Sequence, residues 1–143
     1  MRTALKLSAA LLASTLASAA LTGAHAHHST AEFNYAKTIV IKGRVKELQW
    51  TNPHSYVQLL VPKKNGSGFD QWGVEIGAPA INAAMGWRKN SVKAGDEVTL
   101  TISTARDGSR YGTLRFLTFA DGRRLDGVAA NVKSDENGYA VFK

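Results

Sequence analysis

The chain has 143 residues, no cysteine and a formal net charge of +7. This length is typical of one domain, and the lack of cysteine excludes disulfides and thiolate metal sites. Any metal site must therefore use nitrogen and oxygen ligands. The basic balance indicates either attraction to anionic partners or simple solubility, because the cations are spread along the chain rather than gathered in one block.

The first 26 residues have the pattern of a secretory signal peptide. Arg2 and Lys6 precede an apolar run over residues 7–21, and Ala24-His25-Ala26 fits the small-x-small pattern before a cleavage site. The run is short for a membrane anchor, which needs about 20 apolar residues. We therefore expect cleavage after Ala26 and a periplasmic or secreted protein with a net charge of about +5, since the two cations leave with the leader.

The mature chain is expected to form an N-terminal arm at residues 27–37, a β domain at residues 38–125 and a C-terminal tail at residues 126–143. Apolar and polar residues alternate in five segments, as in half-buried strands. These segments are Thr38–Trp50, His54–Pro62, Phe69–Ile76, Glu97–Thr104 and Tyr111–Phe119. A further short strand is expected at Tyr139–Phe142.

The order of these elements predicts a small closed barrel. Pro79 near the start and Gly86 at the end delimit a short helix at Ala80–Met85, between the third and fourth strands. Three strands, a helix and two strands is the order of the five-stranded Greek-key barrel known as the OB (oligonucleotide/oligosaccharide-binding) fold. Gly43 predicts a bulge or bend in the long first strand. A plain antiparallel sandwich is the alternative within the all-β class.

The expected new N-terminus, His27-His28-Ser29, is the best candidate for metal chemistry. A free amine can chelate one ion with the His27 imidazole, or with the intervening amide nitrogen and the His28 imidazole. His54, at the predicted corner between the first two strands, would add another imidazole. Nitrogen ligands of this kind favour Cu(II), which stands at the top of the divalent affinity order. The alternative is adventitious binding by two adjacent histidines, with His54 only hydrogen-bonded to the backbone.

Glu75 is the internal carboxylate that the pattern singles out. It lies on the strand face opposite Trp72, so it is either solvent-exposed beside a cation or turned inward as a metal ligand or partner of His54. No nucleophile–base set accompanies it, and one internal histidine defines no reaction. An enzymatic function is therefore the least supported class.

The aromatic residues suggest an alternative function as a binding module. Trp50, Tyr56 and Trp72 would form a stacking platform if they share one face, with lysines and arginines nearby. Trp72 alternates with Val74 and Ile76, however, which is equally typical of a core position. Nucleic acid is a poor ligand for an exported protein, so we expect an anionic envelope component or a partner protein on such a surface.

Several motifs together resemble a family of small exported bacterial proteins known only as a domain of unknown function. The most specific are the leading His-His-Ser and Trp50-Thr51-Asn52-Pro53-His54. Weaker ones are Glu32-Phe33, Lys42-Gly43 with Val45, Trp72 with Val74-Glu75, Gly86-Trp87, Gly95-Asp96-Glu97-Val98-Thr99 and Ala120-Asp121-Gly122-Arg123. The resemblance spans about His27 to Leu125 and implies a secreted or periplasmic single domain. It transfers no activity.

Overall fold

The structure is a computed structural model that describes residues 28–141, with side chains from residue 30 onward. Its helices are α2 (His28–Ala31) and α3 (Pro79–Ala84). Its strands are β1 (Phe33–Gln49), β2 (Ser55–Pro62), β3 (Phe69–Gly77), β4 (Glu97–Ala105), β5 (Tyr111–Phe119), β6 (Arg124–Asp126), β7 (Lys133–Ser134) and β8 (Ala140–Val141). Neither helix of this part of the chain has the length and hydropathy to cross a bilayer.

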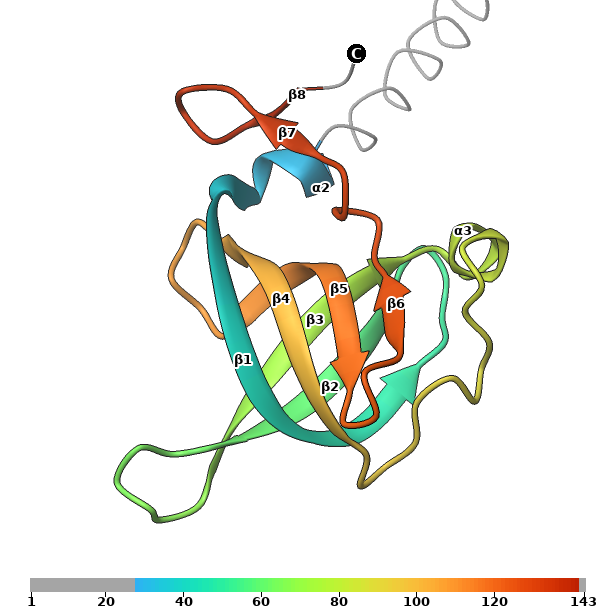
Figure 1. The fold of residues 1–143 in the computed structure, drawn as a ribbon. Coiled ribbons are helices and arrows are strands. Elements are labelled where there is room, and N and C mark those ends of the chain that lie inside the picture. The colour runs from blue at the N-terminus through green and yellow to red at the C-terminus, as the bar shows by residue number, and fades with distance from the viewer. Residues whose placement is uncertain (1–27, 142–143) are drawn as a thin grey trace, which may run out of the picture.

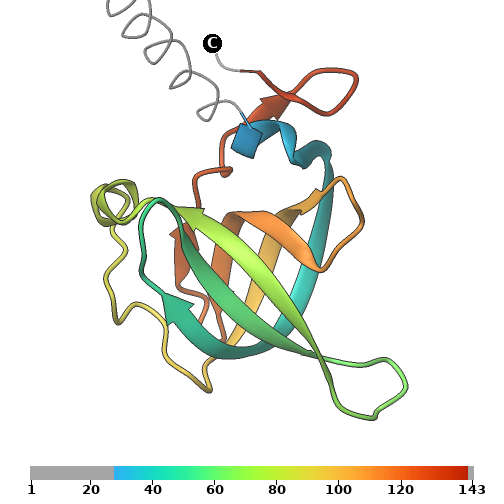
Figure 2. The same ribbon diagram turned by 180° about the vertical axis from the view of Figure 1, so that it is seen from behind.

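The main sheet curls into a closed barrel (Figure 1). Its strands run in the order β3-β2-β1-β4-β5-β6, and β3 also pairs in parallel with β5, which joins the two sides. Figure 2 shows the closing side, where β2 and β3 cross in front of β4 and β5. This is the OB-type strand order, with α3 between β3 and β4. The predicted five-stranded Greek-key barrel is confirmed, and the alternative sandwich was wrong.

The length and bend of β1 let one strand serve both halves of the barrel. Arg44 is paired with Leu60 of β2 and also with Glu97 of β4. A Cβ on Gly43 would collide with the carbonyl oxygen of Leu60, so only glycine permits this close approach. The register irregularity between β1 and β2 lies between Val45 and Glu47, two residues beyond the predicted bend.

The barrel interior is filled by the apolar residues of the alternating strands and by Trp87. Thirteen of its residues are buried: Ile41, Val45, Val57, Leu59, Val74, Ile76, Trp87, Val92, Val98, Leu100, Ile102, Leu114 and Leu117. Trp87 is fully buried, and its Nε1–H donates to the carbonyl oxygen of Asp126 at 2.7 Å. This bond ties the loop after α3 to β6, at the point where the chain leaves the barrel.

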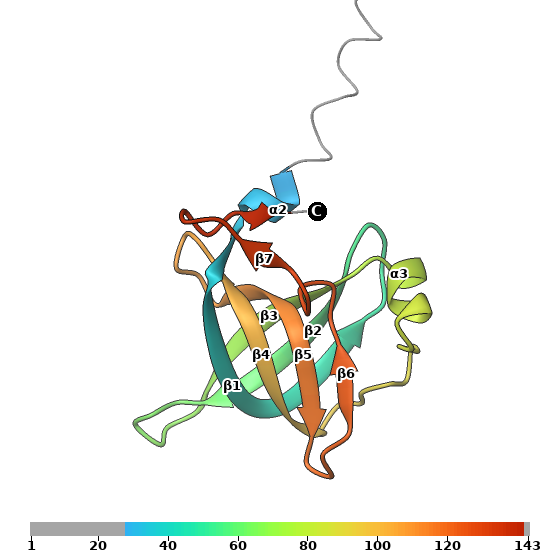
Figure 3. The same cartoon turned by 45° about the horizontal axis from the view of Figure 1, so that its top comes forward.

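Both ends of the described chain pack against the outside of the barrel. β1 begins at Phe33, inside the segment expected to be an arm, and Phe33 and Tyr35 form a second buried cluster with Ala129. Beyond β6, residues 127–132 form a strap along β5, where the Gly127 and Ala129 N–H groups donate to the carbonyl oxygens of Arg115 and Leu114, and lead into the β7–β8 hairpin. Figure 3 shows this hairpin beside α2. The segments expected to be an arm and a tail therefore cover one barrel face together.

Candidate functional site

His54 lies at the corner between β1 and β2, as its place after Asn52-Pro53 predicted. The Thr51 hydroxyl donates to the carbonyl oxygen of His54 at 2.8 Å, and the Ser55 hydroxyl donates to the carbonyl oxygen of Thr51 at 3.4 Å. Ser55 is fully buried. These local bonds hold the backbone of the corner from which the His54 side chain projects.

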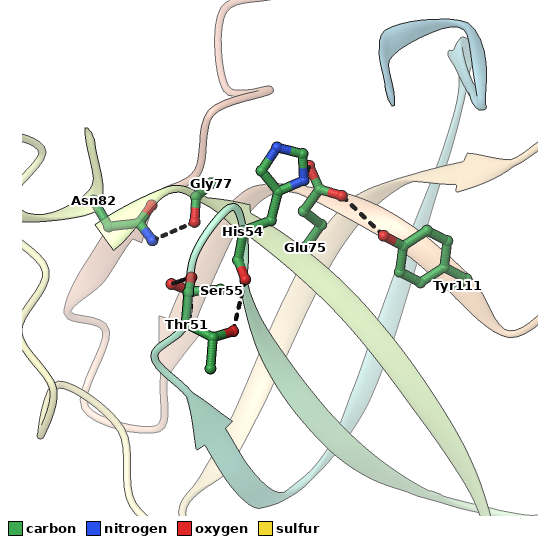
Figure 4. Close-up of polar contacts among 7 residues, drawn as sticks. All are labelled: Thr51, His54, Ser55, Glu75, Gly77, Asn82 and Tyr111. Carbon is green, nitrogen blue, oxygen red and sulfur yellow. Dashed lines mark hydrogen bonds and ion pairs between the residues drawn. The ribbon is translucent and has the colours of Figure 1, made fainter. Parts of the chain in front are cut away.

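Glu75 connects His54 to Tyr111 through its two carboxylate oxygens (Figure 4). His54 Nδ1 lies 3.1 Å from Glu75 Oε1, and the Tyr111 hydroxyl donates to Glu75 Oε2 at 2.8 Å. Glu75 is 6% exposed, whereas the His54 side chain is 30% exposed. The carboxylate is thus a buried acceptor between one partly accessible imidazole and one phenol.

This arrangement determines which ring nitrogen of His54 faces Glu75 and which one faces away from it. An ionised carboxylate can only accept hydrogen bonds, so the position of Glu75 Oε1 3.1 Å from His54 Nδ1 favours the tautomer with the ring hydrogen on Nδ1. In Figure 4 the other ring nitrogen, Nε2, points away from the carboxylate. In the neutral ring this nitrogen holds a free lone pair. A carboxylate behind a histidine is the usual way in which proteins orient a metal-binding imidazole.

The buried carboxylate also acts on the neighbouring tyrosines. Burial first, and then the charge of Glu75, raise the pKa of Tyr35 from 10.0 to about 12, while the charge of Arg115 acts to lower it. Burial, followed by the charge and the hydrogen bond of Glu75, raises the pKa of Tyr111 far above its ordinary value. Both phenols are neutral at physiological pH.

A cavity of about 270 Å³ adjoins His54 and Glu75. The start of β1 and the strap supply much of its wall, and its lining is mainly apolar. The lining residues are Thr30, Phe33, Tyr35, His54, Glu75, Gly77, Ala78, Ile81, Thr113, Val128, Ala129 and Val132. At its α3 side, the Asn82 amide donates to the carbonyl oxygen of Gly77 at 2.8 Å and holds the helix to the end of β3 (Figure 4).

Comparison with known proteins places the chain in a family. A family described as a family of unknown function (DUF6152) matches residues 13–115, which is most of the chain. The chain belongs to this family. No curated protein matches it. Among solved structures it is similar to the mitochondrial single-stranded DNA-binding protein Rim1 of S. cerevisiae, with 15% identity and a TM-score of 0.45 over 59% of this chain and 93% of that chain.

Only some of the predicted metal ligands belong to the part of the chain that the structure describes. His27 and the side chain of His28 lie outside them. His54 and Glu75 are brought together, and Thr30, two residues after His28, lines the same cavity. Among the described side chains, residues 30–141, no three or more histidine, aspartate or glutamate side chains gather as a metal site.

The three aromatic residues expected to form a platform are separated by the barrel wall. Trp50 and Trp72 are partly buried and pack against the interior cluster. Tyr56 pairs with Glu75 across β2 and β3, on the opposite face from Trp72, and its ring lies 6.3 Å from that of Tyr111. The reason is the alternation of β3, in which Trp72 shares the inward face with Val74.

Sequence reasoning missed the residues that complete the surroundings of Glu75. These are Tyr35, Tyr111, Thr113 and the strap residues Val128, Ala129 and Val132. For β5 a signal did exist, because closure of the predicted barrel pairs β3 with β5 and places Thr113 directly beside Glu75. For the strap we find no signal in its composition.

Proposed function

We propose that this protein binds one metal ion, copper, through its processed N-terminus and His54, in the periplasm or outside the cell. The amino-terminal part of the ligand set is the chelate formed by the α-amine with His27 or His28. His54 Nε2 completes the set. The protein acts in this proposal as a metal-binding or metal-handling module rather than as an enzyme.

The observation that carries the proposal is the orientation of His54. Its Nδ1 is engaged by a carboxylate that is 6% exposed, so the Nε2 lone pair is left for a ligand. The cavity beside it is also lined by Thr30, and two residues of chain span at most about 7 Å. An amino-terminal histidine at position 28 is therefore within reach of the same cavity.

The choice of copper follows from the donor atoms. An amine and imidazoles are nitrogen ligands, and the chain has no cysteine to favour a softer or tetrahedral site. Nitrogen donors in a plane suit Cu(II), and its affinity exceeds that of the other divalent first-row ions for the same donors. Nickel is the metal to compare with it.

We give Glu75 a more definite part than the sequence alone supported. Its Oε1 lies 3.1 Å from His54 Nδ1, and its Oε2 accepts from the Tyr111 hydroxyl. A metal ion bound directly to Glu75 would compete with these contacts. In our proposal Glu75 therefore fixes the orientation and the tautomer of His54 and does not itself bind copper.

Titration of Cu(II) into protein that begins at His27 tests the proposal. We expect one tight equivalent, much weaker binding after the α-amine of His27 is acetylated, and weaker binding in His54→Ala. The mass and metal content of the protein from its native compartment establish the cleavage site independently. Equal binding by the acetylated protein contradicts the amino-terminal chelate, and salt-sensitive binding of an anionic envelope polymer without metal would favour the alternative function as a binding module.

A further inference from the structure

Arg115 of β5 joins three separate parts of the chain. Its Nε donates to the Ser103 hydroxyl of β4 at 2.9 Å, and its Nη2 donates to the carbonyl oxygen of Tyr35 at 2.7 Å. Its Nη1 donates to the carbonyl oxygens of Ala129 at 3.4 Å and Val132 at 3.3 Å. One half-buried guanidinium therefore holds the start of β1 and the strap against the barrel.

The backbone groups that Arg115 holds belong to the wall of the His54 cavity. Tyr35, Ala129 and Val132 all line that cavity, together with His54 and Glu75. Arg115 itself is not among the lining residues, so it acts from behind the wall. The start of β1 is also the segment that directly follows α2 and the amino-terminal histidines.

The chemistry of the Arg115 side chain suits the bridging of acceptors on several chain segments. None of the ion pairs among residues 30–141 involves Arg115, so the charge is used on neutral carbonyl and hydroxyl acceptors. A guanidinium presents five N–H donors in a rigid plane, and lysine has three donors at one point. Only arginine can bridge acceptors on three segments at once. Three of its four acceptors are backbone carbonyl oxygens, so its role is to place chain segments.

We propose that Arg115 is the positioning residue of the site: it holds the amino-terminal segment and the strap so that the N-terminal chelate and His54 bind the same ion. This inference rests on the proposed copper site. It predicts that Arg115 contributes to metal affinity only when His54 is present. A residue that merely stabilised the fold would lower affinity by the same factor with and without His54.

A double-mutant cycle between Arg115→Met and His54→Ala, in protein beginning at His27, tests this coupling. We expect Arg115→Met to weaken Cu(II) binding by roughly 10-fold to 100-fold, the range for residues that orient metal ligands. In the His54→Ala background we expect a change of less than about twofold, because the imidazole toward which Arg115 holds the amino-terminal segment is gone. The copper EPR spectrum of Arg115→Met should shift toward that of His54→Ala.

Two further variants keep the test decisive. Arg110→Met removes the same charge from an exposed ion pair with Asp70, 3.2 Å long, and should leave affinity unchanged. Arg115→Lys retains the charge and replaces Arg115→Met in the cycle if the latter does not fold, and we expect partial recovery at most. Wild-type protein that binds no copper would refute the proposed function. Two results would refute the positioning role alone. One is that the Arg115 variants bind copper as tightly as wild-type protein does. The other is that replacing Arg115 lowers copper affinity by the same factor with and without His54.

Discussion

Replacing Glu75 by glutamine removes the charge behind His54 and keeps the size of the side chain. The carboxylate lies 3.1 Å from His54 Nδ1 and accepts a 2.8 Å hydrogen bond from the Tyr111 hydroxyl. An amide has one acceptor oxygen and a donor NH₂ group, so it cannot accept from both donors in the same way. The His54 ring then loses its fixed orientation or its tautomer. Partners of this kind are worth about 10-fold to 100-fold in metal affinity, or roughly 1.4–2.7 kcal/mol.

The assay is a competition titration of Cu(II) against a chelator of known affinity, combined with nitrogen NMR of the His54 tautomer. Loss of a charge-assisted hydrogen bond also costs about 1.5–3 kcal/mol, partly offset because a buried carboxylate no longer has to be desolvated. We therefore expect the free energy of unfolding to fall by about 1–2 kcal/mol. Glu97→Gln is the matched control, since Glu97 pairs with Arg44 at 3.5 Å on an exposed surface. Copper affinity in Glu75→Gln within twofold of wild type would refute the reasoning.

Two further predictions concern the support of the site. Trp87→Phe removes the 2.7 Å bond from the indole to the carbonyl oxygen of Asp126 and leaves space in the core, so urea unfolding should show a free energy of unfolding lower by about 2–3 kcal/mol. The control is Trp72→Phe, at a partly exposed tryptophan, which should lower the free energy of unfolding less. An equal loss in the two variants would contradict the account. For Tyr35, the pKa of about 12 in the folded protein against an ordinary value of 10.0 means that only the unfolded chain releases this proton between pH 10 and pH 12. Stability should therefore fall through that window by up to about 2–3 kcal/mol. Tyr35→Phe should show a shallower fall, measured by denaturation at several pH values, and an unchanged slope would contradict the assigned pKa.

The barrel was predictable because each of its strands carries its own signal. In β3, Trp72, Val74 and Ile76 alternate with polar residues and glycine, and the structure places all three toward the interior cluster. The turn signals and the short helix leave few possible orders for the five strands in the sheet. Closing the sheet into a barrel then fixes one of these orders. Pairing of neighbouring strands depends on local patterns that a sequence contains.

The covering of the outer face was not predictable in the same way. Alternation places Glu75 opposite Trp72, which normally means solvent, yet Glu75 is 6% exposed. It is buried because the start of β1 and the strap cover that face. The strap is attached through backbone carbonyl oxygens of Ala129 and Val132, which accept bonds from Arg115. Every residue has such a carbonyl, so these contacts leave no pattern in the strap sequence.

The start of β1 shows a second limit of local reasoning. Phe33 pairs with Ala105 and Thr38 with Ser103, with an irregularity between Asn34 and Thr38. This break hides the period-two pattern, so the segment resembled an arm. Its aromatic side chains anchor it in the second cluster instead.

Counting the nitrogen ligands of bound copper tests the central claim most directly. Pulsed EPR on copper-loaded protein beginning at His27 should show one imidazole coupling fewer in His54→Ala than in wild type, with the amino-terminal couplings retained. An identical set of nitrogen couplings in the two proteins would show that the imidazole at the β1–β2 corner does not bind the ion, and would contradict the account.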